Sequence, residues 1–210
     1  MRIILIALIS CFSSLAFADN NTLLDAMNKF NRLMSDETLR QQAYEAGQDR
    51  IRFCGHCHGE NGNSKRDYIP NLASQNPVYL FRQFEKFANG ERKDYVMSEL
   101  AKVLTLDDRI NIAIYYSQQQ VEPKPSVNAE LEQQGAQLYN KVCFSCHGRS
   151  GQGMEEMPRL AGQPASYIKH SLNLFRNNDP SRANSPMMGI ASMLSDKDIE
   201  AVAAYLQQLD

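Results

Sequence analysis

The sequence lacks three features that mark large classes of protein. It has no run of about 20 apolar residues, the length a transmembrane helix needs. It has no excess of basic charge, since 22 Lys and Arg stand against 24 Asp and Glu, so no basic field for nucleic acid is expected. It also has no alternating strand pattern. Apolar residues recur at helical spacing instead, as at Ile199, Val202 and Leu206, which predicts an all-α fold.

The start of the chain has the pattern of an export signal. Met1-Arg2 is followed by an apolar run and then by Ala16-Phe17-Ala18, which predicts cleavage after Ala18 and a periplasmic protein. Lipid attachment at Cys11 is an alternative, but too little hydrophobic sequence precedes it. Removing the leader takes away one basic side chain, Arg2, and leaves four of the five cysteines.

The remaining chain is an internal duplication. Cys54-Gly55-His56-Cys57-His58 recurs later in the chain as Cys143-Phe144-Ser145-Cys146-His147. Similarity extends far beyond these motifs, so one module has been duplicated. The other matched positions are Pro70–Gln75 with Pro158–Gln163, Tyr79 with Tyr167, Phe87 with Phe175, Met97 with Met187, and Tyr115 with Tyr205.

Two prolines, Pro123 and Pro125, interrupt the chain between the copies and favour an extended linker. Each copy is predicted to run helix, motif, loop, helix, loop, helix. Thr105 and Ser195 open the last helices, each with an acid three residues on, which resembles a capping box. The predicted parts are a leader at 1–18, a helical extension at 19–46, modules at 47–120 and 130–210, and a linker at 121–129.

A Cys-x-x-Cys-His run is the attachment signature of c-type haem. The two thiols add to the vinyl groups of the porphyrin, which holds the adjacent histidine under the iron. A zinc site or redox dithiol would use similar cysteine pairs, but Cys57 and Cys143 lie too far apart in the sequence for a zinc ribbon. We therefore expect two haem c groups, attached at Cys54 and Cys57 and at Cys143 and Cys146.

The axial ligands of the irons decide between a carrier and a catalyst. His58 and His147 are the predicted proximal ligands, whereas His56 is replaced by serine in the second copy. Met97 follows His58 at almost the same interval as Met187 follows His147, so both are predicted distal ligands, each on the loop before the last helix. His/Met ligation closes the iron and suits electron transfer. Met188 and His170 are the alternatives in the second module.

The paired motifs, the Pro-x-Leu-Ala-x-Gln segments and the late methionines resemble the dihaem cytochrome c4 family over residues 47–210. The resemblance implies two class I cytochrome c domains related by a pseudo-twofold axis, with no enzymatic activity. It also implies electron transfer from a cytochrome bc1-type donor to a haem-copper oxidase, near the membrane surface.

A carbonyl from Pro70 or Pro158 would, by the same resemblance, accept a hydrogen bond from each proximal histidine; simple turn prolines are the alternative. The alternative functions are an electron-accepting subunit of a periplasmic dehydrogenase and a dihaem peroxidase.

Overall fold

A computed structural model describes residues 14–126 and 128–210. Cys11 and most of the predicted leader lie outside these residues, so export and cleavage after Ala18 stay predictions. The described chain divides into two compact units, with the division after residue 41. In the part of the chain that the structure describes, no helix has the length and apolar character needed to cross a membrane.

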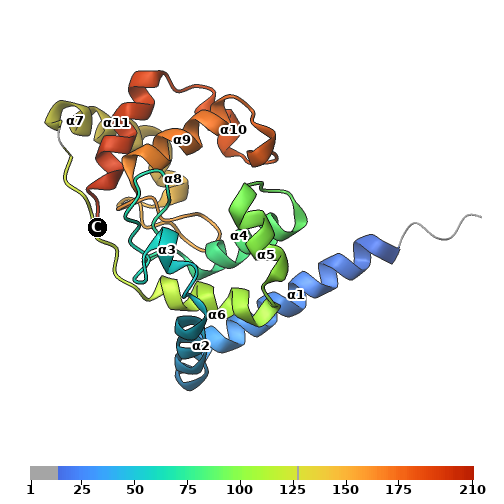
Figure 1. Ribbon diagram of the computed structural model, residues 1–210. Coiled ribbons are helices and arrows are strands. Elements are labelled where there is room, and N and C mark those ends of the chain that lie inside the picture. Colours follow the sequence, from blue (N-terminus) through green and yellow to red (C-terminus); the bar gives the residue numbers. More distant parts are fainter. Residues whose placement is uncertain (1–13, 127) are drawn as a thin grey trace, which may run out of the picture. The chain divides into compact units, whose positions relative to one another are not determined.

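Two helices, α1 (Ser14–Ser35) and α2 (Glu37–Arg50), begin the described chain (Figure 1). The break between them follows from local hydrogen bonding, because the Asp36 carboxylate accepts a bond of 3.0 Å from the Leu39 N–H and so starts α2 as a capping residue does. The predicted extension is therefore helical. Since α2 continues through residues 46 and 47, the predicted start of the first module falls inside this helix.

The duplication is visible as two similar sets of helices, and the all-α prediction is confirmed. The first set contains α2, α3 (Gly55–His58), α4 (Pro77–Asn89), α5 (Tyr95–Val103) and α6 (Leu106–Ser117). The second set contains α7 (Ala129–Leu138), π-helix η1 (Tyr139–Cys143), α8 (Phe144–His147), α9 (Ala165–Arg176), 3₁₀-helix η2 (Pro180–Arg182), α10 (Met187–Ala191) and α11 (Asp196–Gln207).

In each module the first and last helices cross in close contact at a glycine. A Cβ atom at Gly47 would overlap the Asn111 carbonyl of α6, and one at Gly135 would overlap the Ala201 carbonyl of α11. Only glycine allows backbones to approach this closely. Figure 1 shows α7 and α11 side by side, in agreement with their extensive contact.

Local signals predicted the helix starts well, with one exception. Thr105 and Ser195 form complete capping boxes with Asp108 and Asp198. Asn76 precedes α4 as expected, but its side chain makes no cap. It donates instead to the Met157 carbonyl of the second module at 2.7 Å. A contact between modules has replaced the local one.

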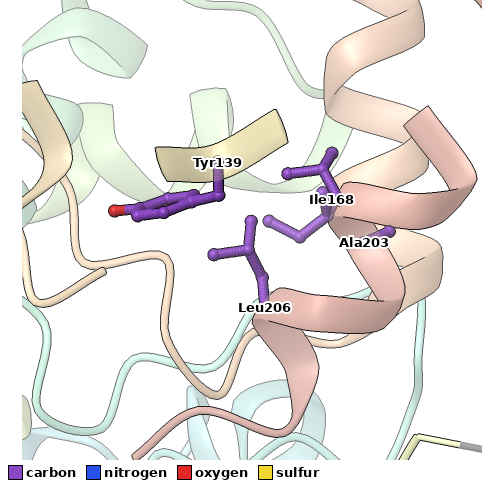
Figure 2. Packing of buried hydrophobic residues seen from close by; sticks show 5 residues of the cluster. Tyr139, Ile168, Ala203 and Leu206 are labelled. Atoms are coloured by element: carbon purple, nitrogen blue, oxygen red, sulfur yellow. The ribbon is translucent and has the colours of Figure 1, made fainter. Parts of the chain in front are cut away.

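The core of the second module surrounds Tyr139, which is fully buried. Figure 2 shows its ring beside Leu206, with Ile168 and Ala203 on the adjoining helices. The ring packs among aliphatic side chains, while its hydroxyl donates a 2.6 Å hydrogen bond to the Gly148 carbonyl, directly after the second motif. The core thereby fixes the end of the motif helix.

Candidate haem sites

Each Cys-x-x-Cys-His motif forms a single helical turn. Residues three apart share a helix face, so Cys54 and Cys57 are placed to react with one porphyrin edge. The turns end at Gly59 and Gly148, whose φ angles are 77° and 80°. L side chains rarely adopt this conformation. The chain can therefore leave the motif sharply, directly after each histidine.

His58 and His147 are both buried and make the same hydrogen bond. Nδ1 of His58 lies 2.9 Å from the Pro70 carbonyl oxygen, and Nδ1 of His147 lies 3.0 Å from that of Pro158. The predicted proline acceptors are confirmed. A carbonyl can only accept, so Nδ1 carries the proton and Nε2 is left free to bind a metal. Burial also lowers the pKa of both rings, which favours the neutral ligand form.

The first cysteine of each motif does not have the properties of a reactive thiolate. Burial raises the pKa of Cys54, and burial with the neighbouring Cys146 raises the pKa of Cys143 to about 11. Redox dithiols and metal thiolates depend on a lowered thiol pKa. Within residues 14–126 and 128–210, no three His, Cys, Asp or Glu side chains form a metal cluster. The raised pKa values of Cys54 and Cys143 argue against the dithiol alternative.

The two candidate methionines lie in helices, although a loop was expected. Met97 is in the first turn of α5, where the Asp94 carboxylate accepts from its N–H at 2.9 Å. Met187 is the first residue of α10, and the Ser185 hydroxyl accepts from its N–H at 3.3 Å. Met188 follows in the same turn. Axial ligation by Met97 or Met187 stays a prediction.

A second set of paired residues was missed in the sequence. Arg92 and Arg182 occupy matching positions of the two modules, and both donate to the Tyr167 hydroxyl, at 3.3 and 3.5 Å. Burial alone would raise the pKa of Tyr167, but the two guanidinium groups outweigh it and lower the pKa to about 7. Among the described residues, neither arginine forms an ion pair with a carboxylate. The internal alignment that pairs Met97 with Met187 also pairs Arg92 with Arg182, so the sequence contained the signal for this arginine pair.

Comparison with known proteins identifies the type of module. The family model for cytochrome c matches residues 132–210. This second module is therefore a cytochrome c domain, and the duplication extends the assignment to its partner.

Comparison over most of the chain gives the particular family. A cytochrome c4 of Thiocapsa roseopersicina is 37% identical, and the match covers 80% of this chain and 92% of that protein. The crystal structure of reduced recombinant cytochrome c4 from Pseudomonas stutzeri has a TM-score of 0.73 at 33% identity, covering 79% of this chain and 98% of that one. The chain belongs to the cytochrome c4 family.

A related match has a more specific description. A thiosulfate dehydrogenase electron acceptor of Thiomonas intermedia is 32% identical, over 73% of this chain and 76% of that protein. Electron acceptance is thus described for a relative that matches most of this chain.

Family membership and the two motifs establish the cofactors. The chain is a haem electron carrier with two covalently bound haem c groups, and it is an electron-transfer protein rather than an enzyme. The described residues fit these groups, because each module offers paired thiols and an oriented histidine. In addition, the buried Nε of Arg159 has no hydrogen-bond partner among the described residues, and a carboxylate of the cofactor would supply one.

Proposed function

We propose that this protein is a periplasmic shuttle that accepts electrons from a respiratory-chain donor and passes them to an acceptor such as a terminal oxidase. Residues 1–18 direct export, and residues 47–120 and 130–210 each carry one haem. His58 and Met97 are the axial ligands in the first module, and His147 and Met187 in the second.

The observation that carries this proposal is the matched arrangement of both modules. Each proximal histidine is buried, held in one tautomer by a prolyl carbonyl, and followed by a methionine at a matching position of the duplicated module. Two closed irons suit outer-sphere electron transfer, whereas a peroxidase needs one open axial position. Bound haem supplies the redox chemistry. The chain's own residues orient the ligands and exclude water from them.

The absorption spectrum of the oxidised protein tests the ligands. The wild type should show the methionine-to-iron charge-transfer band at an intensity for two haems. Met97→Leu and Met187→Leu should each remove about half of it, because each variant opens one iron. Met188→Leu is the matched control and should leave the band unchanged. Loss of band intensity in Met188→Leu, with none in Met187→Leu, would reverse the assignment in the second module.

The arginine pair supports haem binding at the junction of the two modules. Two guanidinium groups around one tyrosine create a positive field without a carboxylate partner among the described residues. Haem propionates are the anions that a cytochrome c brings with it, and charge-assisted bonds to arginine are strong. Arg92→Gln and Arg182→Gln should lower the reduction potentials, because removing a nearby cation favours the oxidised iron. Unchanged potentials in both variants would place the propionates elsewhere.

A second candidate function is that of an electron acceptor for a periplasmic dehydrogenase. The similarity to a thiosulfate dehydrogenase electron acceptor favours it. The chemistry in the haem modules is the same, and only the donor differs. Stopped-flow spectroscopy with thiosulfate and a purified thiosulfate dehydrogenase should show rapid haem reduction if this is the donor. Reduction by a cytochrome bc1 complex with quinol, but not by the dehydrogenase, would support the respiratory shuttle.

A further inference from the structure

Two buried glutamines cross between the modules. The side chain of Gln163, in the second module, accepts from the Asn71 N–H at 3.0 Å and donates to the Asn71 carbonyl at 2.8 Å. The side chain of Gln75, in the first module, bonds the backbone of Arg159 in the same way, at 2.7 and 2.9 Å. Both glutamines are about as buried as the core, with exposures of 3% for Gln163 and 4% for Gln75.

The backbone groups that the glutamines bind belong to the peptide units that hold the proximal histidines. The peptide joining Pro70 to Asn71 accepts from His58 Nδ1 at its carbonyl oxygen and donates to Gln163 from its N–H. The peptide joining Pro158 to Arg159 does the same for His147 and Gln75. Each histidine is therefore connected, through one peptide group, to a glutamine of the other module.

We infer that Gln163 and Gln75 are positioning residues that tune the haem of the opposite module. Hydrogen bonds in a chain polarise one another. An acceptor on the peptide N–H makes the peptide carbonyl a stronger acceptor, which gives the histidine more imidazolate character. A more basic ligand stabilises the ferric iron. Gln163 thus lowers the potential of the haem at His58, and Gln75 lowers that of the haem at His147.

The arrangement makes the module interface part of each redox centre. Opening the interface would weaken both histidine hydrogen bonds and raise both potentials. The inference rests on the proposed axial roles of His58 and His147. Those roles are tested separately by the methionine-to-iron band of the wild type, which requires a haem with both axial ligands in place, so the two can fail independently.

A crossed pair of variants tests the inference in the full-length holoprotein. Gln163→Met keeps the side-chain length but removes both hydrogen bonds, and Gln75→Met does the same in the other direction. NMR-monitored redox titration follows the haem methyl resonances of each haem. Gln163→Met should raise the potential of the first haem more than that of the second, and Gln75→Met should do the reverse.

The histidine provides a second readout that a purely structural role would not move. The Nδ1 proton resonance of His58 in the reduced protein should shift to lower frequency in Gln163→Met, as its hydrogen bond weakens. Asn76→Ala is the matched control. It removes a bond between modules to the Met157 carbonyl, which accepts from no histidine, and should leave both potentials unchanged.

Equal shifts of both haems, or a larger shift of the haem in the glutamine's own module, would overturn the inference. If Gln163→Met does not fold, Gln163→Glu retains an acceptor oxygen for the Asn71 N–H. It should lower the potential of the first haem more than that of the second. A larger effect on the second haem in this variant would also refute the crossed connection.

Discussion

The two modules support the end of the haem motif with tyrosines from different helices. In the first module Tyr116, from the last helix, donates to the Gly59 carbonyl at 3.4 Å. In the second module Tyr139, which follows the first helix, donates to the equivalent Gly148 carbonyl at 2.6 Å. The aligned partners are Ile51 in place of Tyr139 and Leu206 in place of Tyr116, and all four are buried.

The exchanged positions of the tyrosine and the aliphatic residue show what the two modules have in common. In the second module the ring of Tyr139 packs beside Leu206. In the first module the tyrosine and the aliphatic residue stand at the exchanged positions, and both are buried. Close packing preserves volume and the buried hydrogen bond rather than the identity at each position.

A second difference concerns one extra residue. The interval from Gly135 to Cys143 is one residue longer than the interval from Gly47 to Cys54. The second module accommodates the additional residue in the π-helix Tyr139–Cys143. A π-helical turn absorbs an insertion without moving the flanking helix, so both the glycine crossing and the motif keep their places.

Removing one haem should have the largest effect on stability. It should unfold the module that loses its haem and leave the other module folded. Each has roughly 80 residues, a size at which a core without its cofactor is marginal. The variant Cys143→Ala, Cys146→Ala should lose the calorimetric transition of the second module and retain that of the first. The equivalent variant at Cys54 and Cys57 is its counterpart. A haem-free second module that still unfolds cooperatively would contradict the expectation.

Adding a methyl group at either helix crossing should destabilise the module concerned. Gly47→Ala and Gly135→Ala both place a Cβ atom against a backbone carbonyl, and overpacking of this kind costs about 2 to 3 kcal/mol. Chemical denaturation should show similar losses for both. Gly90→Ala is a useful contrast, because a Cβ atom there meets nothing within 4 Å, although its φ of 83° adds some backbone strain.

Moving the tyrosine of the first module from the last helix to the first should be tolerated only when both substitutions are made together. Tyr116→Leu removes ring volume and a buried hydrogen bond, at a cost of roughly 3 kcal/mol. Ile51→Tyr alone overfills the first module. The double variant reproduces the arrangement of the second module and should recover at least half of the loss in urea denaturation. Additive losses would show that the two positions do not share one space.

Removing only the hydroxyl groups should have the smallest effect. Tyr139→Phe should cost about 1 kcal/mol and Tyr116→Phe less, because the hydrogen bond of Tyr139 is the shorter. Thermal unfolding monitored at each Soret band would compare them. A larger loss for Tyr116→Phe would mean that the bond lengths do not reflect the strength of the two contacts.

The prediction from sequence succeeded where the signal was local or repeated. The capping boxes at Thr105 and Ser195 each join an N-cap side chain to an acid in the next turn. The prolyl acceptors lie only a short loop beyond the histidines that they bind. The expectation of a loop around Met97 was wrong because Asp94 caps a short helix there, a signal that the sequence contained. The structural role of Asn76 was hidden, since its partner is Met157 in the other module.

The amino-acid sequence by itself determined the two covalent haem groups, the duplication and the helical class, because these depend on motif chemistry, internal alignment and residue periodicity. Only the tertiary structure decided that Gln75 and Gln163 each bind the histidine-holding peptide of the opposite module. It also decided which helix supplies the buried tyrosine. Most of these contacts join parts of the chain that are distant in sequence. They form because the two modules pack together and because buried polar groups must find partners wherever the fold brings them.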